Sequence, residues 1–145
     1  MKILFAVDGS DYTIKAANYL ATHFEWFQGA PELHLLHVKL PIPVGLAVVQ
    51  AERILGGDAV DLYYKEEAEA ALAPAEEILR KNNIPFQSTY KVGDIAKEIH
   101  AYAVQNRMDM IVMGSHGHGA LKNLVMGSVA TKVLAATDIP VLIVR

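Results

Sequence analysis

The sequence contains no cysteine, and this absence excludes several classes of protein at once. Disulfide-stapled scaffolds, thiolate zinc sites, iron–sulfur clusters and enzymes with a cysteine nucleophile all need that side chain. Long apolar runs are also missing. The longest uncharged stretches, residues 40–51 and 110–121, fall short of the roughly 18 apolar residues of a membrane-spanning helix. We therefore expect a cytoplasmic protein with no membrane partner.

An excess of positive charge is absent as well. The 13 lysine and arginine residues are outnumbered by 16 aspartate and glutamate residues, which gives a net charge of −3. This balance offers no broad basic surface, so we expect no nucleic-acid partner. With 145 residues, 52% of them apolar, the chain is long enough to bury a core, and we expect one domain over residues 1–145.

Short apolar runs alternate with helical patterns along the whole chain. This alternation predicts an α/β fold with a five-stranded parallel open sheet and helices on both faces. The predicted strands are residues 2–7, 33–38, 86–91, 110–113 and 141–144, and the predicted helices are 11–27, 59–83, 94–106 and 128–136.

Two features disturb this pattern. Pro74 lies inside the predicted helix 59–83, for which Asp58 is the expected N-cap, and should kink or interrupt that helix. The connection 39–58 is long, carries Pro41, Pro43, Gly56 and Gly57, and has a short helix expected at 46–55. It is either a variable surface excursion or a flap over a ligand.

A glycine-rich run from Gly114 to Ser128 follows the fourth predicted strand. Ligands of open parallel sheets bind at the carboxyl ends of the strands, so this run lies where a ligand is expected. Glycines let backbone N–H groups approach an anion, and the following helix N-terminus adds a favourable dipole. Residues 114–145 carry three basic side chains against Asp138, a net charge of +2, whereas the rest of the chain holds −5. The run predicts a polyphosphate cradle, and the alternative is a turn that only caps a helix.

The spacing Gly114-x2-Gly117-x9-Gly127-Ser128 resembles the signature of ATP-binding universal stress proteins, whereas the P-loop and dinucleotide motifs are absent. Residues 6–10, 36–38, 109–114 and 139–144 also resemble segments of that family, so the resemblance covers nearly the whole chain. It implies a sheet of order 3-2-1-4-5, as in adenine nucleotide alpha hydrolase-like folds. It also implies a homodimer built through the strand Val141–Val144, which would otherwise be an open apolar edge.

The resemblance further implies roles for individual residues. Asp8 would lie beside the adenosine, and Val38 would contact the adenine. The ribose and phosphates would be held by Gly114, Gly117, Gly127, Ser128 and the backbone N–H of Val129. Ser115 lies within the same run and is a further candidate for cofactor binding.

Four histidines complete the set of candidate residues. His116 and His118 could contact phosphate, ligate a metal or face solvent, and we expect no metal site because no other ligands cluster with them. His34 and His37 are separated by an odd number of residues, so on a strand they point to opposite faces. We expect both to be core or helix-facing side chains.

These observations favour an adenine-nucleotide-binding protein. We expect ATP, together with Mg²⁺, to bind a dimeric switch or binding module that acts in stress response on an unknown protein partner. The alternatives are a slow ATPase or phosphotransferase, or a dimeric interaction protein that binds AMP, a cyclic nucleotide or no nucleotide. No recognisable catalytic arrangement is present, so we expect weak ATP hydrolysis at most.

Overall fold

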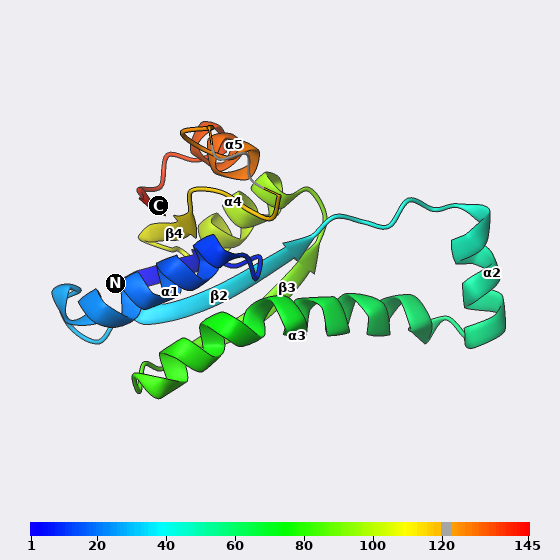
Figure 1. Ribbon diagram of the computed structural model, residues 1–145, viewed down its shortest axis with the longest axis horizontal. Helices are drawn as coiled ribbons and strands as arrows, with labels where there is room; N and C mark the ends of the chain where they lie inside the picture. The colour runs from blue at the N-terminus through cyan, green and yellow to red at the C-terminus, as the bar shows by residue number, and fades with distance from the viewer. Residues whose placement is uncertain (120–122) are drawn as a thin grey trace.

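The computed structural model describes residues 1–119 and 123–145, and contains one parallel five-stranded sheet of order β3-β2-β1-β4-β5 (Figure 1). This confirms the expected fold class and strand order. The elements are β1 (Lys2–Ala6), α1 (Asp11–His23), η1 (Phe24–Trp26), β2 (Glu32–Lys39), α2 (Leu46–Leu55), α3 (Asp58–Lys81), β3 (Gln87–Val92), α4 (Ile95–Gln105), β4 (Met110–Gly114), α5 (Ser128–Ala136) and β5 (Val141–Val144).

The sheet divides the hydrophobic core into two layers. Alternate residues of β1 and β2 pack with α1 and α3 on one face, and the intervening residues pack with α4 and α5 on the other. The central strand β1 is buried from both sides, with Ile3, Leu4 and Phe5 all fully inaccessible. A strand of this kind reads as a continuous apolar run, which is why the sequence indicates it so clearly.

Helix α3 differs from the sequence expectation in two respects. It runs without interruption from Asp58 to Lys81 although Pro74 lies inside it, and its N-cap is Gly57 instead of Asp58. A buried stripe of Ala68, Leu72, Ala75 and Leu79 packs on the core on both sides of the proline. Tertiary packing of this stripe therefore outweighs the local cost of the proline.

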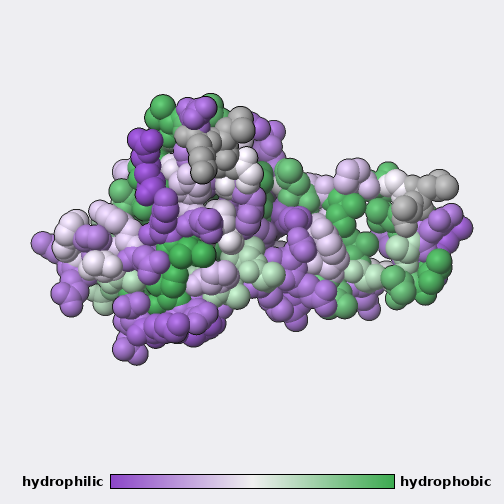
Figure 2. All heavy atoms as spheres, viewed as in Figure 1, coloured by the Kyte–Doolittle hydropathy of each residue, from purple (hydrophilic) through white to green (hydrophobic). Residues whose placement is uncertain are grey.

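The connection after β2 forms an arm that projects from the body of the protein (Figure 1). Helix α2 contacts α3, and among the described residues of the connection only Lys39 and Leu40 line the large cavity described below. The structure thus corresponds to the surface excursion and not to a flap over the ligand site. Apolar side chains lie exposed on this arm (Figure 2), among them Val44, Ile54 and Leu55 at 86%, 80% and 71% exposure.

No helix in the part of the chain that the structure describes is both long and apolar enough to cross a bilayer. Even α3, the longest helix, carries acidic and basic side chains along its length.

We expect Pro74→Ala to stabilise the protein. The substitution restores an N–H group inside a continuous helix, and the gain should be about 2 kcal/mol, since proline also restricts the unfolded chain. Denaturant titration followed by circular dichroism measures the free energy of unfolding. A loss of stability would show that the proline ring itself is required for the packing of α3.

Candidate functional site

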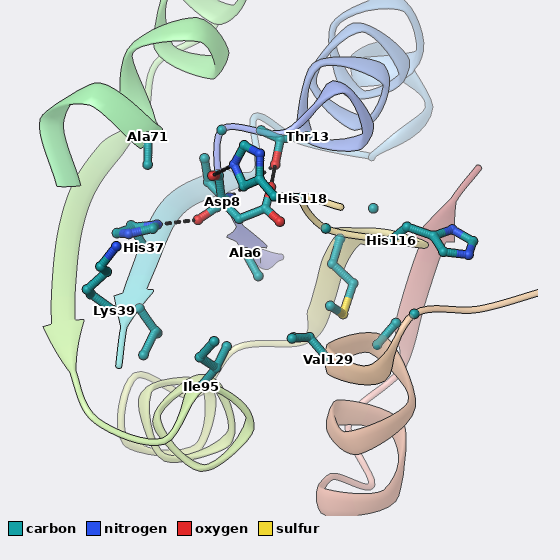
Figure 3. Close-up of a pocket in the computed structure, with 18 of the residues that line it drawn as sticks. Ala6, Asp8, Thr13, His37, Lys39, Ala71, Ile95, His116, His118 and Val129 are labelled. Atoms are coloured by element: carbon teal, nitrogen blue, oxygen red, sulfur yellow. Dashed lines mark hydrogen bonds between the residues drawn. The ribbon is translucent and has the colours of Figure 1, made fainter. Parts of the chain in front are cut away.

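A cavity of about 960 Å³ opens at the carboxyl ends of β1, β2 and β4 (Figure 3). Its position follows from the topology. The chain leaves β1 toward β2 on one side, whereas β4 and β5 extend the sheet on the other side. Loops that follow β1 and β4 therefore diverge and leave a crevice, which is where ligands of open α/β sheets bind.

The structure brings together nearly all the residues that the sequence singled out. Those that line the cavity are Asp8, Val38, Gly114, His116, Gly117, His118, Gly127, Ser128 and Val129. Ser115 is the exception. It is only 1% exposed, its N–H donates to the Val144 carbonyl, and its hydroxyl is 2.8 Å from Nδ1 of His116. Ser115 therefore lies outside the cavity lining, and its N–H and hydroxyl bond within the protein.

Asp8 follows β1 and is held by the first turn of α1. Its Oδ1 accepts hydrogen bonds from the Ser10 N–H at 2.9 Å and from the Thr13 hydroxyl at 2.8 Å. Ser10 in turn caps α1, with its side chain accepting from the Thr13 N–H, as the sequence predicts. The carboxylate is therefore fixed in orientation, with Oδ2 directed toward Gly117.

Each glycine of the predicted motif lies at a close approach between segments. A Cβ at Gly114 would lie 2.6 Å from Cβ of Tyr12 and 3.0 Å from its backbone carbon. At Gly117 it would lie 2.8 Å from Oδ2 of Asp8, and at Gly127 it would lie 3.1 Å from Cα of His116. The spacing of the motif thus reflects three separate steric requirements.

The two histidines of the run bond to backbone carbonyls. Nε2 of His116 lies 2.8 Å from the Leu124 carbonyl, and Nε2 of His118 lies 2.8 Å from the Asp8 carbonyl. In Figure 3, His118 lies over Asp8, whereas His116 points away from the centre of the cavity. Since both ring nitrogens of His116 bond within the protein, the expectation that its side chain contacts phosphate does not fit this geometry.

Beyond the glycines, α5 presents its N-terminus to the cavity. Gly127 is the N-cap, and Ser128 and Val129 form the first turn. The N–H groups of a first turn have no partner within the helix, and the helix dipole adds partial positive charge there. This end of the cavity is therefore suited to an anion.

Another part of the cavity, between β2 and α4, is apolar. It is formed by side chains on the α4/α5 face of the sheet, namely Ala6, Leu36, Val38, Ile95, Ile99 and Met113. A planar aromatic group fits such a lining, because it has large apolar faces to bury.

Sequence reasoning missed a polar group at the rim of the cavity. Nζ of Lys39 lies 2.8 Å from Oε2 of Glu67, which joins the end of β2 to α3. The hydrogen bond to Glu67 raises the pKa of Lys39, and the same bond lowers the pKa of Glu67. His37, expected as a core residue, is buried and directs Nδ1–H to the Val7 carbonyl at 2.8 Å, yet it also lines the cavity.

Sequence spacing carried no signal for the Lys39–Glu67 pair, since 28 residues separate the partners. His34 matches its core expectation, with hydrogen bonds to Tyr102 and Glu32. Among the residues that the structure describes, no group of three or more histidine, aspartate or glutamate side chains could hold a metal ion.

A cavity with a helix N-terminus at one end and apolar side chains at the other, at the switch point of a 3-2-1-4-5 sheet, is the ligand-site arrangement typical of open α/β proteins. The universal stress protein family model matches residues 1–145, and the chain belongs to this family.

Individual relatives support this membership. The universal stress protein YxiE of Bacillus subtilis is 35% identical, with 99% of this chain and 98% of YxiE covered. The solved structure of MJ0577, a universal stress protein of Methanocaldococcus jannaschii, is 28% identical with a TM-score of 0.75, and covers 99% of this chain and 94% of its own. A universal stress protein of Archaeoglobus fulgidus, solved in complex with dAMP, shares the fold at 22% identity and a TM-score of 0.67, with 100% and 98% covered.

We expect Gly114→Ala to destabilise the fold by about 1 to 3 kcal/mol, because the new Cβ would overlap Tyr12 and its backbone. Gly57→Ala is the matched control, since a Cβ at Gly57 meets nothing within 4 Å and the backbone there is already helical. Thermal and denaturant unfolding of both variants measure the difference. Equal stability of the two would contradict the close approach of β4 to α1.

Proposed function

We propose that this protein binds ATP with Mg²⁺ in the cavity and acts as a nucleotide-dependent binding module. The observation that carries the proposal is the convergence of three close-packed glycines, the α5 N-terminus and the oriented Asp8 carboxylate around one cavity. The dAMP complex of the Archaeoglobus relative supports an adenine nucleotide as the ligand.

Each end of the cavity has a role in this proposal. The apolar part beside Val38 takes the adenine, and the ribose lies beside Asp8. Phosphates lie against the backbone of Gly114, Gly117 and Gly127 and the first turn of α5, where N–H groups and the helix dipole favour negative charge.

The carboxylate of Asp8 would repel phosphate directly, so it serves the ribose or a Mg²⁺ ion. Mg²⁺ in nucleotide sites is commonly held by one or two carboxylates together with phosphate oxygens and water. One oriented carboxylate facing the glycines is compatible with that arrangement.

The histidine and aspartate side chains that line the cavity form hydrogen bonds within the protein, which favours a binding function over a catalytic one. Hydrolysis needs a base that positions water near the terminal phosphate. The histidines beside the glycines bond to backbone carbonyls, and Oδ1 of Asp8 is engaged by α1. We therefore propose a binding module that hydrolyses ATP slowly at most. Release of phosphate measures this hydrolysis.

The direct test is to denature the purified protein, identify any released nucleotide, and titrate ATP, ADP, AMP and cyclic AMP by calorimetry with and without Mg²⁺. ATP bound near one per chain, and more tightly than the monophosphates, is the expected result. If AMP or cyclic AMP binds more tightly than ATP, that nucleotide is the ligand and the assignment of ATP is overturned. Absence of binding by all four would overturn the proposal.

We expect Gly117→Val to weaken ATP binding at least tenfold while leaving stability close to that of wild type. The added side chain would occupy the space next to Oδ2 of Asp8, in the lining of the cavity and outside the hydrophobic core, so the cradle is filled without disturbing the core. Gly57→Val introduces the same side chain where nothing lies within 4 Å and serves as the control. Undiminished ATP affinity of the Gly117 variant would contradict the assignment of the cradle.

The proposal includes a homodimer in which the free edges of two β5 strands pair. The carbonyls of Pro140 and Val144 accept hydrogen bonds from Ile111 of β4 and from Ser115, so the N–H and C=O groups of Val141 and Ile143 face the free edge. An unpaired apolar edge of this kind invites association, and a two-fold axis closes it.

We expect Ile143→Pro to convert the dimer to a monomer without unfolding the sheet. Proline removes the outward N–H while the bonds between β4 and β5 remain. Light scattering gives the mass, and circular dichroism verifies the fold. A folded variant that stays dimeric would place the interface elsewhere.

A further inference from the structure

We infer that His116 is a positioning residue that holds the phosphate-binding backbone in shape without touching the ligand. This inference rests on the proposed function, since it concerns the backbone that is proposed there to bind the phosphates. Its basis is a set of contacts that tie together residues 115–117 and 123–127, the two described halves of the glycine loop.

The ring of His116 bridges these halves through both nitrogens. A carbonyl oxygen can only accept, so Nε2 carries a hydrogen and donates it to the Leu124 carbonyl at 2.8 Å. In the neutral ring Nδ1 is then an acceptor, and the hydroxyl of Ser115 donates to it at 2.8 Å. One tautomer therefore satisfies both contacts.

Burial makes this bridge effective. His116 is 9% exposed and Ser115 is 1% exposed, so water has little access to either partner. The ring of Tyr12 packs against the imidazole, with centroids 4.9 Å apart, and fixes it from the side of α1. Hydrogen bonds shielded in this way are costly to leave unmade.

A backbone hydrogen bond also links the two halves of the loop. The Gly127 N–H donates to the Ser115 carbonyl at 2.7 Å, and a side chain at Gly127 would meet Cα of His116. The N-cap of α5 is thus held directly against the end of β4. We conclude that the imidazole bridge, together with this backbone bond, holds the backbone next to Gly117 close to the N-terminus of α5, the two surfaces proposed to enclose the phosphates.

Two conservative substitutions separate the two contacts of the ring. In His116→Asn, the short amide reaches the position of Nδ1 and can retain Ser115, but it cannot reach Leu124. In His116→Gln, the longer amide places an N–H near the position of Nε2 and can retain Leu124. The pair therefore tests the bridge, with folding of each variant verified by thermal unfolding.

The measured quantity is the ratio of ATP affinity to adenosine affinity in each protein. His116→Asn should lower ATP affinity about tenfold and leave adenosine affinity within about twofold, because only the phosphates depend on the loop. His116→Gln should recover most of the ATP affinity. A purely structural role would lower both affinities together and would not be rescued by glutamine.

The outcomes distinguish this inference from the proposed function. If wild type binds ATP and the asparagine variant binds it equally well, or loses ATP and adenosine in equal measure, the positioning role is overturned and the proposed function stands. If wild type binds neither ligand, the proposed function fails and the inference fails with it.

Discussion

The parallel pairing of β1 with β4 at the centre of the sheet is the constraint on which the rest of the structure depends. Ile3, Leu4 and Phe5 lie beside residues 110–112 in register, and both strands are covered by helices on each face. Because the two strands run in the same direction, their ends deliver Asp8 and Gly114 to one edge. Because Gly114 has no side chain, Tyr12 of α1 packs directly against the end of β4. The cavity opens between the loops that follow β1 and β4.

The sequence predicts such a fold well wherever burial alone determines the pattern. Three elements match the structure residue for residue, namely 141–144, 128–136 and the arm helix 46–55. Each begins directly after a proline or a glycine, which marks its start in the sequence. Pro74 marks the limit of local reasoning. The cost of a proline arises at one residue, whereas the buried stripe that stabilises the continuous helix α3 exists only in the assembled core.

The site is predictable to the extent that its chemistry is local in sequence. Glycine spacing pointed to the loop after β4, and each glycine proves to occupy a tight contact. The contacts that set side-chain roles are not local. Whether His116 faces a ligand or Leu124 depends on how the loop folds back, and the Lys39–Glu67 pair exists only because β2 and α3 lie together. A histidine in a glycine loop therefore has a predictable position but not a predictable partner.

A nucleotide-dependent switch requires that the ligand favour one arrangement of a surface over another. In this chain a short series of contacts links the cavity to the base of the arm. Val38 lines the apolar end of the cavity, and Lys39 is paired with Glu67. At the base of the arm the Ile42 N–H donates to the Tyr64 hydroxyl at 2.7 Å. The arm is thus anchored to α3 at the rim of the cavity while its exposed apolar side chains lie far from it. A ligand that altered the end of β2 would act on this anchor first, so under the proposed function these two contacts couple the cavity to the arm.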